Sequence, residues 1–111
     1  MDKVKSMLDE VTISRIAMLN DAFRKQGIGY MLTGGVQTVT NLMGLLQAVK
    51  DYNSFNEDND PYGEHDFGRI DWHGDKVFWK IDYYNRGYTG GEDPLASDCK
   101  RVLTVMLANK Y

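Results

Sequence analysis

The residues best suited to chemistry lie together in one short segment, FNEDNDPYGEHDFG, residues 55–68. The segment has no Lys or Arg, and its ionisable residues are Glu57, Asp58, Asp60, Glu64, His65 and Asp66. Carboxylates bind hard cations, and together with an imidazole they also carry out acid–base catalysis. The same residues suit a surface that binds a basic protein. The segment therefore has three interpretations: a metal or catalytic site, a protein-binding surface, and a solvated loop.

The spacing within this segment does not match a calcium loop of the EF-hand type. In such a loop alternate positions supply oxygen ligands, and here Tyr62 occupies one of them. In an extended chain, Glu64 and Asp66 would also point to one side and His65 to the other. We therefore assign no catalytic residue, metal ligand or cofactor. A small metal-dependent hydrolase centred on Glu64, His65 and Asp66 remains the alternative function.

The charge of the chain is unevenly distributed. Residues 51–75 hold eight acidic residues and one basic residue, a net charge of −7, so the rest carries +4 in a total of −3. A nucleic-acid-binding protein usually shows clustered Lys and Arg, and here the concentrated charge has the sign that phosphate repels. We therefore expect no direct binding of nucleic acid. The expected partner is another protein with a basic surface.

The length and composition predict one cytoplasmic domain. A chain of 111 residues suits a single core, and we expect one domain over residues 1–111 with residues 1–8 flexible. No apolar run approaches the roughly 18 residues of a membrane helix, and residues 1–11 lack the apolar stretch of a signal peptide. The single cysteine, Cys99, fits a reducing compartment. No membrane partner is expected, and a homodimer is left open.

Apolar periodicity predicts two helices before the acidic segment. In the first, over residues 9–26, the inward-facing residues are Ile13, Ile16, Leu19 and Phe23. Asn20 and Arg24 are expected to face away from the core. A second helix is predicted over residues 36–50, and a short strand over residues 28–33 separates the two helices.

The clearest hairpin signal lies at residues 67–84, where two runs of aromatic and β-branched residues flank a turn at Gly74-Asp75. Its second strand should place one face in the core: Val77, Trp79, Ile81 and Tyr83. Asp93-Pro94 is typical of a helix start and predicts a last helix over residues 94–109. The expected fold is an α+β domain of order α-β-α-β-β-α, with a small antiparallel sheet packed against three helices.

Several segments of the chain resemble a known bacterial family. They are RIAMLNDAFR (15–24), NDPYGEHDFG (59–68), FWKIDYYN (78–85) and the run from Asp93-Pro94 to RVLTVMLANKY (101–111). On these segments the sequence resembles the family known as domain of unknown function 3768, although Asn85 stands where the family pattern has Asp. The resemblance implies a stand-alone compact domain from alphaproteobacteria, carried by plasmids and phages. It transfers no activity.

This setting leads to a functional hypothesis. Small acidic proteins of mobile elements often inhibit host defence by occupying a basic nucleic-acid-binding surface. We predict a non-enzymatic protein-binding module that inhibits a CRISPR or restriction system. Complementary charge would orient the complex and the aromatic residue would supply affinity. The predicted contact residues are Glu57, Asp58, Asp60, Tyr62, Glu64, His65 and Asp66.

Overall fold

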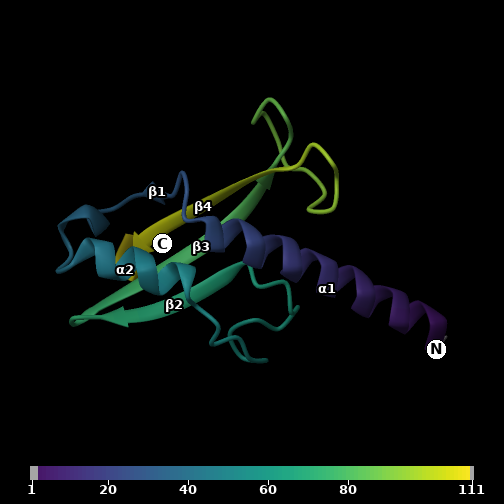
Figure 1. Ribbon diagram of the computed structural model, residues 1–111, viewed down its shortest axis with the longest axis horizontal. Helices are drawn as coiled ribbons and strands as arrows, with labels where there is room; N and C mark the ends of the chain where they lie inside the picture. The colour runs from purple at the N-terminus through teal and green to yellow at the C-terminus, as the bar shows by residue number, and fades with distance from the viewer. Residues whose placement is uncertain (1–2, 111) are drawn as a thin grey trace.

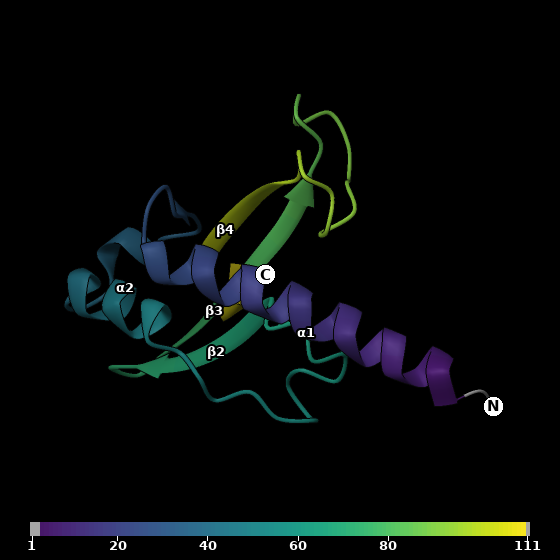
Figure 2. The same ribbon diagram turned by 45° about the vertical axis from the view of Figure 1, so that its right-hand side comes forward.

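The computed structural model describes the backbone of residues 3–110 and the side chains of residues 9–109. Its elements are, in order, α1 (Lys3–Gln26), β1 (Met31–Leu32), the 3-10 helix η1 (Val36–Thr38), α2 (Leu42–Lys50), β2 (Phe67–Trp72), β3 (Asp75–Tyr84), β4 (Lys100–Leu107) and the 3-10 helix η2 (Ala108–Lys110). The two α-helices lie against one side of the sheet, and the N-terminal half of α1 projects beyond it (Figures 1 and 2).

The sheet has four strands in the order β1-β4-β3-β2. β1 runs parallel to β4, whereas β4, β3 and β2 pair antiparallel. The sheet is therefore mixed, and the predicted purely antiparallel sheet was wrong. The predicted order and the count of three helices were also wrong, although the α+β class is confirmed.

The hairpin is confirmed. β2 and β3 pair from Phe67↔Lys80 to Trp72↔Asp75 around a tight turn at His73 and Gly74, one residue earlier than the predicted turn at Gly74-Asp75. Both turn residues have positive φ (49° and 88°), the conformation that two-residue hairpin turns require. The predicted core face of the second strand is also correct for Val77, Trp79 and Ile81, which are 0%, 0% and 4% exposed, whereas Tyr83 is only partly buried.

The predicted last helix is a strand instead. Asp93 does start a turn, since its side chain accepts a hydrogen bond from Leu95 N (2.8 Å) and its carbonyl accepts one from Ala96 N (3.0 Å). The chain does not continue as a helix, and residues 100–107 form strand β4, which pairs with residues 77–84 of β3. Two residues apart, Leu103 and Val105 are both fully buried. This period of two and the β-branched residues of the segment favour the strand.

The two earlier helices also differ in their bounds from the prediction. α2 begins at Leu42, and only η1 lies within residues 36–41, because Asn41 has a φ of 51° and caps the helix by accepting from Gly44 N. α1 already begins at Lys3. Residues 1–8 were expected to be flexible. Residues 1–2 and the side chains of residues 3–8 lie outside the described part of the chain. The strand expected over residues 28–33 covers only Met31–Leu32.

The core lies between the helices and the sheet and contains Val36, Leu45, Val49, Val77, Trp79, Leu103 and Val105. α1 adds Ile16 and Ala17, but its two most buried side chains are Asn20 (0% exposed) and Arg24 (1%). The prediction that these two face outward was wrong, and Leu19, expected inside, is 43% exposed. Of the helices within residues 3–110, none is long and apolar enough to cross a membrane.

Candidate functional site

The acidic segment between α2 and β2 is fixed by its own side chains. Asn56 Oδ1 accepts hydrogen bonds from Asp58 N (2.8 Å) and Asn59 N (3.1 Å). Asn59 Nδ2 donates to Ser54 O (2.8 Å), and Asp60 N donates to Asn56 O (2.8 Å). Asn side chains that bond the backbone in this way stabilise consecutive turns. We call residues 53–66 the acidic loop.

His65 closes the acidic loop by turning inward. Its backbone has a φ of 57°, and its amide lies 3.3 Å from both carboxylate oxygens of Asp60. Nδ1 of its ring lies 3.1 Å from both oxygens of Asp21 on α1. The ring stacks on Phe55, with centroids 3.9 Å apart and planes 3° from parallel. His65 therefore joins the two ends of the loop to each other and to α1.

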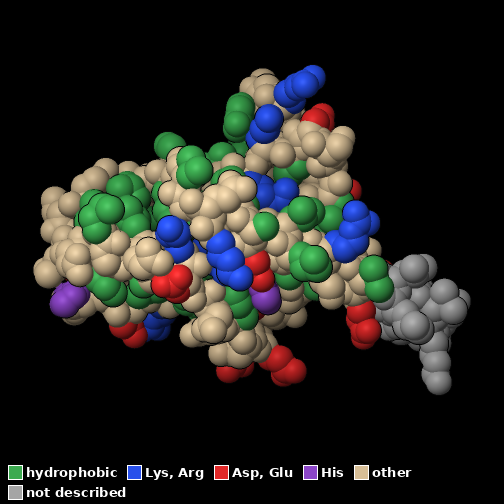
Figure 3. All heavy atoms as spheres, in the orientation of Figure 1, with side chains coloured by type: hydrophobic (Ala, Val, Ile, Leu, Met, Phe, Trp, Pro, Cys, Tyr) green, Lys and Arg blue, Asp and Glu red, His purple; other side chains and the backbone are tan. Residues whose placement is uncertain are grey.

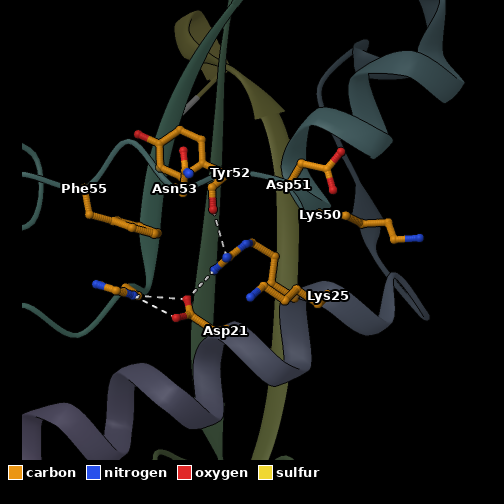
Figure 4. Close-up of a pocket in the computed structure, with 9 residues that line it drawn as sticks. Asp21, Lys25, Lys50, Asp51, Tyr52, Asn53 and Phe55 are labelled. Carbon is orange, nitrogen blue, oxygen red and sulfur yellow. Dashed lines mark hydrogen bonds and ion pairs between the residues drawn. The ribbon is translucent and has the colours of Figure 1, made fainter.

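Arg24 makes a second connection from α1. The Asp21 carboxylate accepts from Arg24 Nη1 (2.9 Å), and Arg24 Nη2 donates to the carbonyl of Tyr52, the residue just before the loop (2.9 Å). The buried guanidinium also lies over the rings of Phe55 (5.5 Å) and Trp79 (5.2 Å). In Figure 4, Asp21 rises from α1 toward the loop, and dashed lines mark its bonds to Arg24 and His65. The buried charge is therefore paired and partly hydrogen-bonded, as burial requires.

A third connection runs through Asn20. Its Nδ2 donates to Glu64 O (2.9 Å) and to the Tyr83 hydroxyl (2.8 Å), and its Oδ1 accepts from Arg101 Nε (2.7 Å). The Tyr83 hydroxyl in turn donates to Asp66 Oδ2 (3.2 Å). One fully buried amide thus joins α1, the acidic loop, β3 and β4.

The electrostatics of the loop follow from partial burial among like charges. Burial raises the pKa of Asp66, an effect that the hydrogen bond from Tyr83 partly offsets. Burial also raises the pKa of Glu64, and the neighbouring carboxylates of Asp66 and Asp60 raise it further. The pKa of Tyr83 is raised as well, chiefly by burial. The loop therefore holds its inner carboxyl groups in surroundings that disfavour their charged form.

The contacts of His65 with Phe55, Asp60 and Asp21 hold the loop to itself and to α1, and we call these contacts the clamp. A carboxylate at Nδ1 would orient an imidazole for acid–base chemistry. The other ring nitrogen, Nε2, has a second carboxylate oxygen, Asp60 Oδ2, at 3.8 Å, so both ring nitrogens lie near carboxylates of the protein itself. The side chains of His65 and Asp66 face different partners, since His65 contacts Asp21 and Asp66 contacts Tyr83. Among the described residues, no group of three His, Cys, Asp or Glu is placed to hold a metal ion.

Two hollows adjoin the clamp. One, of about 450 Å³, is lined by Asp21, Arg24, Lys25, Lys50, Asp51, Tyr52, Asn53, Phe55 and His65, and its charges of both signs favour no single kind of ligand. The other, of about 380 Å³, lies within the loop, and its lining includes Phe55, Glu57, Asp60 and Tyr62. Acidic side chains gather around the loop at the lower edge of Figure 3. The lining of this second hollow includes two aromatic residues, two acidic residues and His65, and it contains no Lys or Arg.

The seven predicted contact residues separate into two groups. Glu57, Asp58 and Tyr62 are exposed, and Tyr62 retains 76% of its accessible surface. The other four are partly buried and make internal bonds: Asp60, Glu64, His65 and Asp66. The outward-facing part of the predicted surface is therefore smaller than the sequence suggested.

A family model described as a protein of unknown function (DUF3768) matches residues 32–110. The chain belongs to this family. The match contains the whole acidic loop and strands β2 to β4, so it covers the resembling segments 59–68 and 78–85 and the run from Asp93-Pro94 as far as residue 110. The segment 15–24, with Asn20, Asp21 and Arg24, precedes the match. No curated protein and no solved structure shows a significant match.

Sequence reasoning missed the residues of α1 that hold the loop. Asn20, Asp21 and Arg24 were not among the predicted site residues, nor were Tyr83 and Arg101. A signal was present for Asn20, because it stands four residues after Ile16 and three before Phe23, on the apolar stripe itself. A polar residue at such a position is buried and needs partners, which the rest of the chain must supply.

Proposed function

We propose that this protein is a non-enzymatic protein-binding module, and that the outer surface of the acidic loop binds a cationic side chain of its partner. The observation that supports this most is the loop hollow, whose lining residues include the aromatic Phe55 and Tyr62 together with the acidic Glu57 and Asp60. An Arg or Lys side chain can pair with a carboxylate and lie against an aromatic ring at the same time. The proposed partner therefore presents Arg or Lys.

The fixed conformation of the loop favours such binding. The turns around Asn56 and the clamp at His65 order the loop before any partner is present. A preordered loop loses less conformational entropy on association than a flexible one, so more of the contact energy appears as affinity. Tyr62 would act as the aromatic anchor, and Glu57 and Asp58 would steer the approach of a basic surface.

A more specific proposal concerns the biological role of this binding. We place the interaction in the cytoplasm and propose that a phage or plasmid encodes the protein as an inhibitor of a CRISPR or restriction system. Its support is the charge of −7 over residues 51–75, which would compete with nucleic acid for a basic surface. Expression in bacteria with an active defence system should raise the plating efficiency of a targeted phage. Unchanged plating across CRISPR and restriction hosts would contradict this form.

The binding proposal is tested by capture from bacterial lysate. The wild-type protein is compared with a surface variant, Glu57→Gln, Asp58→Asn and Tyr62→Ala. Asp60 and His65 are left intact because they hold the loop together. The matched control changes an exposed acid and an exposed tyrosine elsewhere, Asp75→Asn and Tyr88→Ala. Circular dichroism checks that all three proteins are folded.

The surface variant should lose the captured partner, and the control should keep it. If Tyr62 is an anchor residue, its loss should weaken binding by about 30-fold or more, the range of a hot-spot residue. A purified partner then allows this factor to be measured by calorimetry. A partner that binds the surface variant and the control equally well would refute the role of the loop.

A further inference from the structure

β2 is an edge strand, and one side of its backbone is unpaired. Ile81 N donates to Asp66 O, the pair directly before β2 in the ladder of the hairpin. Because hydrogen-bonded pairs alternate along an antiparallel ladder, Gly68 also bonds to β3. The N–H and C=O groups of Arg69 and Asp71 therefore point away from the sheet. Within the described part of the chain, no group bonds to them.

This edge is regular and open. β2 has six residues, each with a partner on β3, and it contains neither a proline nor a bulge. The opposite edge strand, β1, has only two residues. Figure 1 shows no further helix or strand of the described chain beyond β2, and the acidic loop joins it at the Phe67 end. A regular, exposed edge is a template for pairing with another chain.

The charges of this edge select the partner. Arg69 and Asp71 are two residues apart, so their side chains share the sheet face opposite the buried Trp79, and they are 49% and 72% exposed. When two copies of β2 pair antiparallel about a twofold axis at Ile70, each Arg69 lies opposite the Asp71 of the other copy. A register moved by two residues either way would oppose two Arg69 or two Asp71 side chains, and like charges directly opposite each other are destabilising. The strand is therefore complementary to itself in this one register.

We propose that two copies of this chain pair through β2, antiparallel and about a twofold axis at Ile70, so that their two sheets become one. Each Arg69 exchanges two backbone hydrogen bonds with Asp71 of the other copy, and the two side chains form an ion pair. On the helix side the two Ile70 side chains meet at the axis, and each already packs against its own core. The contact is isologous and uses the long edge of each sheet, so it closes as a dimer.

The first test combines sedimentation of the full chain with amide hydrogen exchange followed by NMR. The protein is studied from about 20 μM to about 1 mM, a range suited to an interface below the roughly 800 Å² per partner of a standard complex. The wild type should pass from monomer to dimer. The amides of Arg69 and Asp71 should then exchange about tenfold more slowly, whereas those of Gly68 and Ile70, which bond to β3, should exchange slowly throughout.

Two results of this test would overturn the proposal. One is a chain that stays monomeric over the whole range. The other is a dimer in which the amides of Arg69 and Asp71 exchange as fast as in the monomer, because the two copies would then meet through another surface. Both measurements use the wild-type protein, so they decide the question even where a variant fails to fold.

The second test reverses the charges of the edge. Arg69→Asp and Asp71→Arg should each weaken the dimer by about tenfold, since each sets two like pairs across the axis. The double variant should recover most of the wild-type affinity, because each copy then offers the reversed pair. Arg86→Asp makes the same charge change on an exposed residue outside the sheet and should have no effect. Circular dichroism checks the fold, and a folded double variant that does not recover would refute the register.

The dimer does not depend on the proposed function, because its residues are separate from the exposed loop residues Glu57, Asp58 and Tyr62. Loop variants that lose partner capture but still dimerise would concern the loop alone. A monomeric chain that still captures its partner would refute the dimer and leave the proposed function intact.

Discussion

Replacing Asn20 by Ala is the most direct test of the network that holds the acidic loop to the fold. Asn20 is fully buried and makes three hydrogen bonds of 2.7–2.9 Å, to Glu64 O, the Tyr83 hydroxyl and Arg101 Nε. The substitution removes all three at once. Arg101 Nε loses an acceptor and the Glu64 carbonyl loses a donor, whereas the Tyr83 hydroxyl keeps its bond to Asp66.

The expected cost follows from these partners. A buried neutral group left without its hydrogen bond costs about 1 kcal/mol, and one on a charged side chain about 2–3 kcal/mol. The unfolding free energy should therefore fall by about 3–4 kcal/mol, a large share of the roughly 5–15 kcal/mol of a typical domain. With a urea slope of about 1.5 kcal/mol per M, the unfolding midpoint should move down by about 2 M.

The assay is urea unfolding at pH 7, followed by circular dichroism and by tryptophan fluorescence. Asn53→Ala serves as the control, because Asn53 is an exposed asparagine of the same loop region. Its effect should stay within about 0.5 kcal/mol. A loss below about 1 kcal/mol for Asn20→Ala, or one no larger than that of the control, would refute the reasoning. The network would then contribute geometry and not stability.

Three further predictions concern the loop and the sheet. Burial and neighbouring carboxylates raise the pKa of Glu64, so the folded state binds its proton more tightly than the unfolded state. The protonated Glu64 side chain stabilises the folded state at low pH, and this contribution is lost as the pH rises through the raised pKa. Glu64→Gln should therefore raise the unfolding free energy at pH 7 but not below about pH 4, as measured by paired urea titrations. His65→Ala should cost about 1–2 kcal/mol and open the loop, which limited proteolysis would detect as new cuts within residues 53–66; an unchanged cleavage pattern would count against the clamp. Gly68→Ala should lower the unfolding free energy by about 3 kcal/mol, because its Cβ would lie 2.2 Å from Nε1 of the buried Trp79. The control is Gly90→Ala, where the nearest atom is 3.7 Å from the new Cβ, and it should leave the melting temperature nearly unchanged.

The parts of the fold that local signals determine were predictable. The hairpin combines alternating residues with a turn at His73 and Gly74, and its register follows from both. α1 and α2 follow from apolar periodicity, although their ends differ by several residues. Helix ends depend on caps such as Asn41, whose left-handed conformation is not visible in the sequence pattern.

β4 shows where local signals fail. Its segment contains apolar residues at steps of three and four, and Asp93 does begin a turn before it. The deciding influence is nonlocal, because β3 offers an edge along which residues 100–107 pair residue by residue. Strand preference depends on such neighbours more than helix preference does. A strand that is buried on one face, with Leu103 and Val105 inside, gains more from this pairing than an isolated helix would.

The sequence predicted the position of the candidate site but not the residues that hold it, again because the deciding contacts are nonlocal. A count of charges identified the acidic loop, but it could not tell exposed carboxylates from those that hold the loop. Asn20 is separated by 44, 63 and 81 residues from Glu64, Tyr83 and Arg101, so only the folded chain brings them together. Asp60, His65 and Asp66 bond through their side chains and Glu64 through its backbone carbonyl, so replacing the first three side chains would change the conformation of the loop as well as its charge. A test of binding that spares these four and alters Glu57, Asp58 and Tyr62 is the one that separates recognition from folding.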